Sequence, residues 1–110
     1  MAKQAKTLTQ QELRRVLDYI ATRPHAARNR AMLLTTHYAG VRVGELAHLR
    51  YADVVDSAGQ IREEIRLEPE QTKGRYARVV FVNAKLKREL ELYLRSHPQT
   101  DPKHRLFYTQ

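Results

Sequence analysis

The first forty residues carry apolar positions at the helical period. Between residues 10 and 22 the spacing is i, i+3, i+4, i+7, which predicts an amphipathic helix. Thr9 and Glu12 form a capping box ahead of it, and an Arg-Pro pair ends it. Residues 26–39 predict a second helix that ends at Gly40. Apolar residues lie on so many of its faces that we expect it to be largely buried. The apolar positions of the two helices are Leu13, Val16, Leu17 and Ile20, then Ala31, Met32, Leu33, Leu34 and Tyr38.

The pattern changes in the second half of the chain. A short third helix is predicted over 42–49, and residues 61–67 then alternate between apolar and charged side chains, as in a half-exposed strand. Residues 76–82 predict a second strand, and the polar segment between the strands, which contains Pro and Gly, predicts an antiparallel hairpin with a mobile tip. Asn83 caps a fourth helix over 84–96. The apolar residues on one side of the second strand are Ala77, Val79 and Phe81.

These elements predict an α+β fold that is mainly α, a helical bundle with one antiparallel β-hairpin or small sheet. The 110 residues, with a mass of 12.9 kDa, suffice for one modest hydrophobic core and not for two independent domains. We therefore expect a flexible leader over residues 1–8 and a single domain over residues 9–110.

The charge of the chain is strongly positive. Lys and Arg number 20 against 12 Asp and Glu, which gives a net charge of +8. The excess lies in the first half, where residues 1–50 hold 9 basic and 3 acidic side chains. An excess of this kind indicates a polyanionic partner, most often nucleic acid.

Several classes of chemistry find no support in the sequence. There is no cysteine, so a disulfide framework, a thiolate metal site and a cysteine nucleophile are excluded, and a reducing, cytoplasmic setting is expected. The five histidines show no familiar metal-ligand spacing. No G-x-S-x-G, Walker A or G-x-G-x-x-G sequence is present, and neither a signal peptide nor a membrane span is predicted.

One stretch, residues 38–49 (YAGVRVGELAHL), stands out chemically. Arg42 follows the glycine that ends one predicted helix and precedes the next helix. A guanidinium fork at such a place suits a phosphate group. Glu45 lies one turn later, where its carboxylate could hold the Arg42 side chain. From the spacing alone, an ordinary i, i+3 surface pair accounts for the same two residues.

The sequence resembles the tyrosine recombinase (phage integrase) family in two places. Residues 40–46 (GVRVGEL) resemble the first arginine box of that family, in which G-hydrophobic-R-hydrophobic-[SG]-E-L is typical, and Leu49 and residues 53–54 resemble its continuation. Residues 71–74 (QTKG) followed by 78–82 (RVVFV) resemble the lysine hairpin of the family. The resemblance covers residues 8–110 and has both motifs in the family's order.

The resemblance implies DNA strand exchange, in which a tyrosine attacks the scissile phosphate and forms a 3′-phosphotyrosyl link. It implies that Arg42 holds the non-bridging phosphate oxygens and stabilises the transition state. It also implies that Lys73 protonates the departing 5′ oxygen as a general acid, with Arg75 beside it against the DNA. Glu45 would be a supporting residue. The implied partner is double-stranded DNA, and neither a metal nor another cofactor is required.

The resemblance is incomplete. After the lysine, the family has an H-x-x-R box, a further His or Trp, and the tyrosine nucleophile, and the resemblance ends before any of these motifs. We therefore expect the first half of a recombinase catalytic domain, truncated, without a nucleophile and catalytically incomplete by itself. Residues 25–28 (HAAR) read H-x-x-R, but they precede Arg42. Tyr108 is the last tyrosine, but it follows the hairpin too closely and no second arginine box precedes it.

Two other classes of function stay open. A winged helix-turn-helix protein would place the helix that starts at Arg42 in the major groove and use residues 73–75 as the wing tip. Glu45 near the reading end, and the lack of Asn or Gln on that helix, argue against it. The other class is an interaction module that does not bind DNA. We also expect self-association, as a dimer or by segment exchange, because the absent half would cover apolar surface on the second helix and the hairpin. The target site, and the choice between integration, excision and resolution, are left open.

Overall fold

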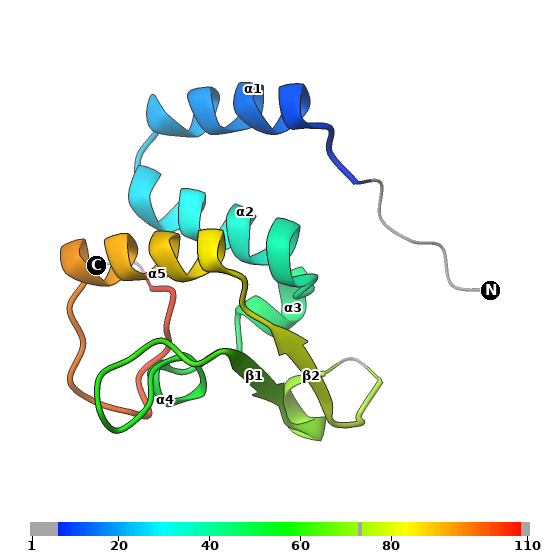
Figure 1. The fold of residues 1–110 in the computed structure, drawn as a ribbon, viewed down its shortest axis with the longest axis vertical. Helices are drawn as coiled ribbons and strands as arrows, with labels where there is room; N and C mark the ends of the chain where they lie inside the picture. Colours follow the sequence, from blue (N-terminus) through cyan, green and yellow to red (C-terminus); the bar gives the residue numbers. More distant parts are fainter. Residues whose placement is uncertain (1–6, 73, 109–110) are drawn as a thin grey trace.

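The computed structural model describes residues 7–72 and 74–108. Five α-helices, a short 3-10 helix and two strands surround one core (Figure 1). In chain order the elements are α1 (Gln10–Ala21), α2 (Ala26–Ala39), α3 (Val43–Leu46), α4 (Tyr51–Val54), β1 (Glu64–Leu67), η1 (Pro69–Gln71), β2 (Arg78–Phe81) and α5 (Ala84–Ser96). The α+β, mainly helical architecture predicted from the sequence is confirmed. The expected leader, residues 1–8, lies almost entirely outside the described residues.

The first two helices begin and end as the sequence indicates. The Thr9 backbone N–H donates to Glu12 Oε1 at 2.9 Å, and the Glu12 N–H donates to Thr9 Oγ1 at 3.1 Å, so the capping box of α1 is complete. Helix α2 ends at Gly40, whose φ of 73° lies in the left-handed region that glycine adopts without strain. The Gly40 N–H donates to the Thr36 carbonyl.

The predicted third helix, residues 42–49, is wrong in its length. Helix α3 ends at Leu46, and a separate helix, α4, which the sequence did not predict, follows at Tyr51–Val54. Ala47 and His48 form a turn, in which the His48 N–H donates to the Glu45 carbonyl at 3.0 Å. Beyond this turn, Leu49 O accepts from Leu106 N at 2.8 Å and Tyr51 N donates to His104 O at 2.9 Å, so the segment is also held by residues 104–106.

The hairpin forms with shorter strands than expected. Strands β1 and β2 pair antiparallel, with Ile65 opposite Val80, and these two side chains face the core. Val79 and Phe81 lie on the opposite face of β2 and are 42% and 66% exposed, so the side of the strand with more apolar residues is the outer one. Ile61 pairs with Val55 in an isolated bridge and not with β2.

Helix α5 closes the core by packing against α2 (Figure 1). Its buried residues Leu86, Leu90 and Tyr93 recur at the helical period, as predicted. The Tyr93 hydroxyl donates to the Leu106 carbonyl at 2.8 Å, and Leu106 is fully buried. Burial raises the pKa of Tyr93 to about 12, so this hydroxyl keeps its proton and its bond at neutral pH. The last described segment is thus packed onto α5.

Candidate nucleic-acid interface

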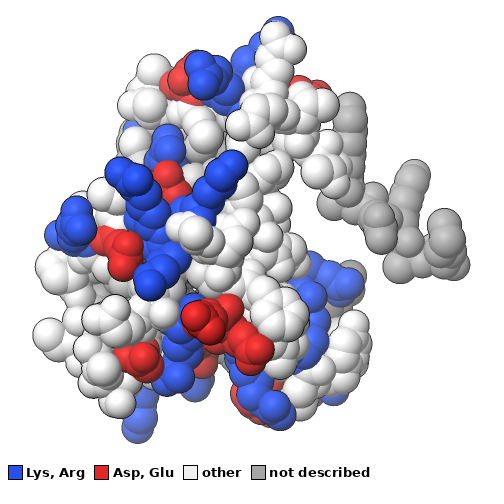
Figure 2. All heavy atoms as spheres, viewed as in Figure 1, with Lys and Arg blue, Asp and Glu red and all other residues white. Residues whose placement is uncertain are grey.

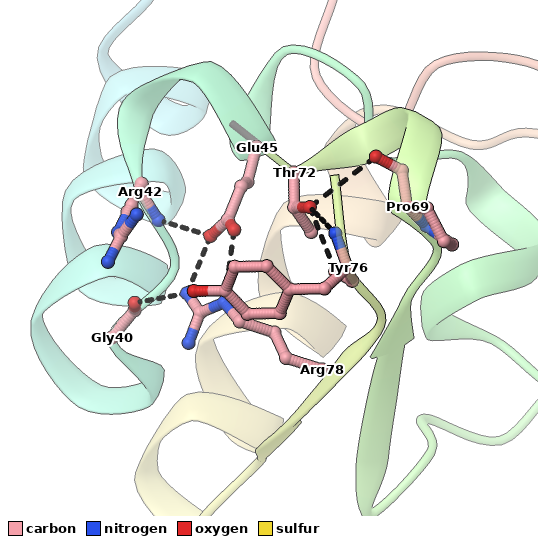
Figure 3. Close-up of polar contacts among 7 residues, drawn as sticks. All are labelled: Gly40, Arg42, Glu45, Pro69, Thr72, Tyr76 and Arg78. Atoms are coloured by element: carbon pink, nitrogen blue, oxygen red, sulfur yellow. Dashed lines mark hydrogen bonds and ion pairs between the residues drawn. The ribbon is translucent and has the colours of Figure 1, made fainter. Parts of the chain in front are cut away.

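A buried carboxylate lies at the centre of the site (Figure 3). Glu45, in the first turn of α3, is 2% exposed. Arg78, from β2, bonds both of its carboxylate oxygens: Nη2 lies 2.6 Å from Oε1 and Nε lies 3.0 Å from Oε2. Arg78 Nη2 also donates to the Gly40 carbonyl at 3.0 Å. A residue of the hairpin therefore ties the end of α2 to the start of α3.

Arg42 lies at the start of α3, within this cluster, but its side chain is left outside. Its backbone N–H donates to Glu45 Oε1 at 2.9 Å. Its guanidinium makes no hydrogen bond or ion pair within residues 7–72 and 74–108, and the residue is exposed. The expectation that Glu45 holds the Arg42 side chain is wrong, because Arg78 occupies both carboxylate oxygens. Glu45 instead fixes the Arg42 backbone and leaves the guanidinium open to a ligand (Figure 3).

The Glu45 and Arg78 side chains stay ionised at neutral pH. Burial acts to raise the pKa of Glu45, but the hydrogen bonds from Arg78 and from the Arg42 N–H, together with the two positive charges, bring this pKa below its usual value. The bond to Glu45 raises the pKa of Arg78, against the effect of burial. The cluster is a charged, fully bonded unit.

The tip of the hairpin is closed by Thr72, which is 8% exposed. Its hydroxyl donates to the Tyr76 carbonyl at 2.9 Å and accepts from the Tyr76 N–H at 3.1 Å. Arg75, inside this turn, has a φ of 56° and is exposed. Lys73 lies outside the described residues. Thr72 and Tyr76 are thus bonded to each other on either side of residues 73–75.

The match to the phage integrase family profile covers residues 6–110. The chain belongs to the phage integrase family. It is similar in structure to a XerA recombinase, with a TM-score of 0.66 and 23% sequence identity. That alignment covers 99% of this chain and 35% of the XerA chain, so our chain spans about a third of that protein. The comparison with curated proteins finds no match.

Membership in the phage integrase family confirms the resemblance stated from the sequence, and the solved structure supports the fold. A winged helix-turn-helix protein is not supported, because α3 has four residues and does not provide a recognition helix. Among the described residues, no helix has the length and apolar character needed to cross a membrane, and no group of three or more His, Asp or Glu could hold a metal ion.

The hairpin of this integrase-family chain is attached at a second point, through Gln71. Gln71 Nε2 donates to the His48 carbonyl at 3.0 Å and to Asp53 Oδ2 at 2.9 Å. Asp53 also accepts from the Arg50 N–H at 2.9 Å, at the start of α4. Through Gln71, the hairpin therefore contacts His48, which follows α3, and Asp53, which lies in α4. Sequence reasoning gave no role to Gln71, Thr72 or Arg78; the one signal is that all three belong to the residues that resemble the lysine hairpin.

The residues that resembled other catalytic groups lie elsewhere. Arg28, of the H-x-x-R sequence in α2, bonds the neighbouring Asn29 at 3.0 and 3.2 Å. Tyr108 lies with its ring edge-on to His97 and His104, with centroid separations of 5.9 and 4.8 Å. Within the described residues, neither Arg28 nor Tyr108 is hydrogen-bonded to Glu45, Arg78 or Arg42.

Proposed function

We propose that these residues bind duplex DNA as the arginine-and-lysine portion of a site-specific tyrosine recombinase. One observation carries this proposal: the Arg42 guanidinium is exposed and unbonded within the described residues, while its backbone is fixed by the buried Glu45–Arg78 pair. Such a group can bind two oxygens of one phosphate side by side. Family membership supports DNA strand exchange as the reaction of the parent enzyme.

In this reaction, a tyrosine oxygen bonds the scissile phosphorus and the bond from phosphorus to the 5′ oxygen breaks. We propose that Arg42 binds the non-bridging oxygens, where negative charge builds up in the transition state. Lys73 gives a proton to the departing 5′ oxygen, which leaves as a hydroxyl. Arg75, exposed in the same turn, contacts the backbone of the DNA. Glu45 takes no part in the bond changes.

The chain by itself is proposed to bind DNA without cleaving it. Its sequence after Lys73 holds no H-x-x-R box, and the XerA chain that it resembles is covered over only 35% of its length. Without an activated nucleophile the covalent step does not occur. The positive charge that attracts the DNA is widespread: Lys and Arg side chains gather over α2 and α5 on the face shown in Figure 2.

Fluorescence anisotropy with a labelled 30-base-pair duplex tests this function. We expect the chain to bind the duplex with an association constant whose logarithm falls linearly with the logarithm of the salt concentration, because phosphate contacts release counterions. A nicked duplex, which traps a phosphotyrosyl link in a competent enzyme, should give no covalent adduct on a denaturing gel. Absence of binding at low salt contradicts the DNA-binding proposal. A covalent adduct contradicts the proposal that the chain is catalytically incomplete. A nanomolar preference for one duplex at physiological salt favours a winged helix-turn-helix DNA-binding protein without catalysis instead.

We also propose that copies of the chain associate. The support is apolar surface on the hairpin, where Phe81 is 66% exposed, and on α3, where Val43 is 74% exposed. Helix α2, which was expected to carry such surface as well, exposes no large apolar side chain. Multi-angle light scattering at increasing protein concentration should show a rise in mass above 12.9 kDa. The double variant Val43→Ser/Phe81→Ser should remove this rise, and a constant monomer mass for the parent chain contradicts the proposal.

A further inference from the structure

Two arginines meet at the Glu45 carboxylate, and they use their side chains in opposite ways. Arg78 makes three N–H bonds inside the protein, to both oxygens of Glu45 and to the Gly40 carbonyl. Its side chain is 27% exposed. Arg42 makes none with its guanidinium among the described residues and gives only its backbone N–H. Arg78 is therefore committed to the protein interior, and Arg42 is available to a ligand.

The bonds of Arg78 enclose the turn that presents Arg42. Gly40 ends α2, Glu45 lies in the first turn of α3, and Arg42 lies between them in an extended conformation with φ −78° and ψ 155°. One guanidinium from β2 thus holds both sides of this turn (Figure 3). Without these bonds, the turn would keep its own backbone bonds, the Arg42 N–H bond to Glu45 and the packing of the buried Val41 side chain, and it would lose its one link to β2 among the described hydrogen bonds.

We propose that Arg78 is the positioning residue for Arg42, so that β2 of the hairpin sets where the phosphate-binding guanidinium lies. This inference rests on the proposed function, in which Arg42 binds a DNA phosphate. Arg78 itself does not contact the DNA. Lys73, the proposed general acid, precedes Arg78 by five residues in the sequence.

The substitution Arg78→Lys separates positioning from charge. It keeps the positive charge, and with it the long-range attraction to DNA, but an ammonium cannot bond two carboxylate oxygens and a carbonyl in one plane. The matched control is Arg66→Lys, because Arg66 lies on the partner strand β1 and makes only a surface contact with Glu68. Both changes are made in the parent chain and in an Arg42→Ala chain, and binding of a labelled 30-base-pair duplex is measured by anisotropy.

Arg78→Lys should weaken binding about 5-fold in the parent chain, a size expected for residues of one hydrogen-bond network. In the Arg42→Ala chain it should change binding less than about 2-fold, since the group through which it acts is gone. Arg66→Lys should change binding less than about 2-fold in both. Loss of folding would weaken binding equally with and without Arg42, so the comparison distinguishes positioning from a general structural effect. Circular dichroism at the assay temperature checks that each variant is folded.

The outcomes separate this inference from the proposed function. If Arg42→Ala alone leaves binding unchanged, the proposed function is wrong. If Arg42→Ala weakens binding but Arg78→Lys has no effect, or weakens binding equally in both chains, the positioning role is wrong. Should Arg78→Lys not fold, Glu45→Gln takes its place, because it keeps the shape of the side chain and loses the carboxylate that Arg78 holds. It should show the same dependence on Arg42, and an equal loss in both chains contradicts the inference.

Discussion

Replacing Leu90 with alanine should lower the free energy of unfolding by about 3 kcal/mol, the middle of the range for fully buried leucines. Leu90 is fully buried on the inner side of α5, the helix that packs against α2. Removing its branched end leaves a cavity between elements that are also connected to the hairpin, because β2 leads directly into α5. Chemical unfolding in urea, followed by circular dichroism, measures the change.

The same helix supplies the matched control. Leu92 lies two residues further along α5 and is 47% exposed. Leu92→Ala removes the same atoms from the surface and should cost less than about 0.5 kcal/mol. Equal effects of Leu90→Ala and Leu92→Ala on the urea midpoint would show that α5 does not pack with this face inward.

Arg78→Ala should also lower the free energy of unfolding by about 3 kcal/mol, because it leaves the buried carboxylate of Glu45 without its charged partner. Glu45 is 2% exposed and would keep only the Arg42 N–H as a partner. Glu45→Ala should cost less than Arg78→Ala, since the Arg78 side chain is 27% exposed and can turn to water. Arg66→Ala, which breaks the exposed contact with Glu68, should cost less than about 1 kcal/mol.

The pH dependence of the Arg78→Ala effect follows from the pKa of Glu45. In the folded parent chain this pKa lies below its value of 4.5 in the unfolded chain. The pair therefore contributes its full stability above pH 4.5, and this contribution is lost as the pH falls through the lower, folded pKa. The difference in unfolding free energy between the parent and Arg78→Ala should be largest near pH 7 and shrink toward pH 3. A difference that is constant over this range would show that the charge of Glu45 is not involved.

Local signals in the sequence predicted the regular elements well. The capping box at Thr9, the left-handed glycine at 40 and the cap at Asn83 each act within a few residues, and the helices that they bound are α1, α2 and α5. The break between α3 and α4 was missed because its cause is distant. The carbonyl of Leu49 is bonded by Leu106, 57 residues away, and no local pattern shows such a bond.

The same limit applies to the site. The sequence indicated Arg42 and Glu45 as a pair because they lie three residues apart. In the structure, the partner of Glu45 is Arg78, 33 residues further along the chain. The one sign of this pairing in the sequence is Arg78 itself, a single arginine beside the apolar residues of a strand. This sign does not show which carboxylate the arginine binds. The Arg42 guanidinium is unbonded among the described residues because Arg78 occupies both oxygens of the carboxylate three residues away from it.

The salt dependence of DNA binding by Arg42→Gln tests the central claim most directly, because it counts phosphate contacts. Arg15→Gln is the matched control, since Arg15 is exposed on α1, which carries neither the Arg42 turn nor the Lys and Arg side chains of α2 and α5. We expect Arg42→Gln to reduce the magnitude of the slope of log K against log salt by about 0.9, the value for one lost phosphate contact. Arg15→Gln should leave the slope nearly unchanged. Equal slopes for the parent chain and Arg42→Gln would contradict the account, because Arg42 would then not bind a phosphate of the DNA.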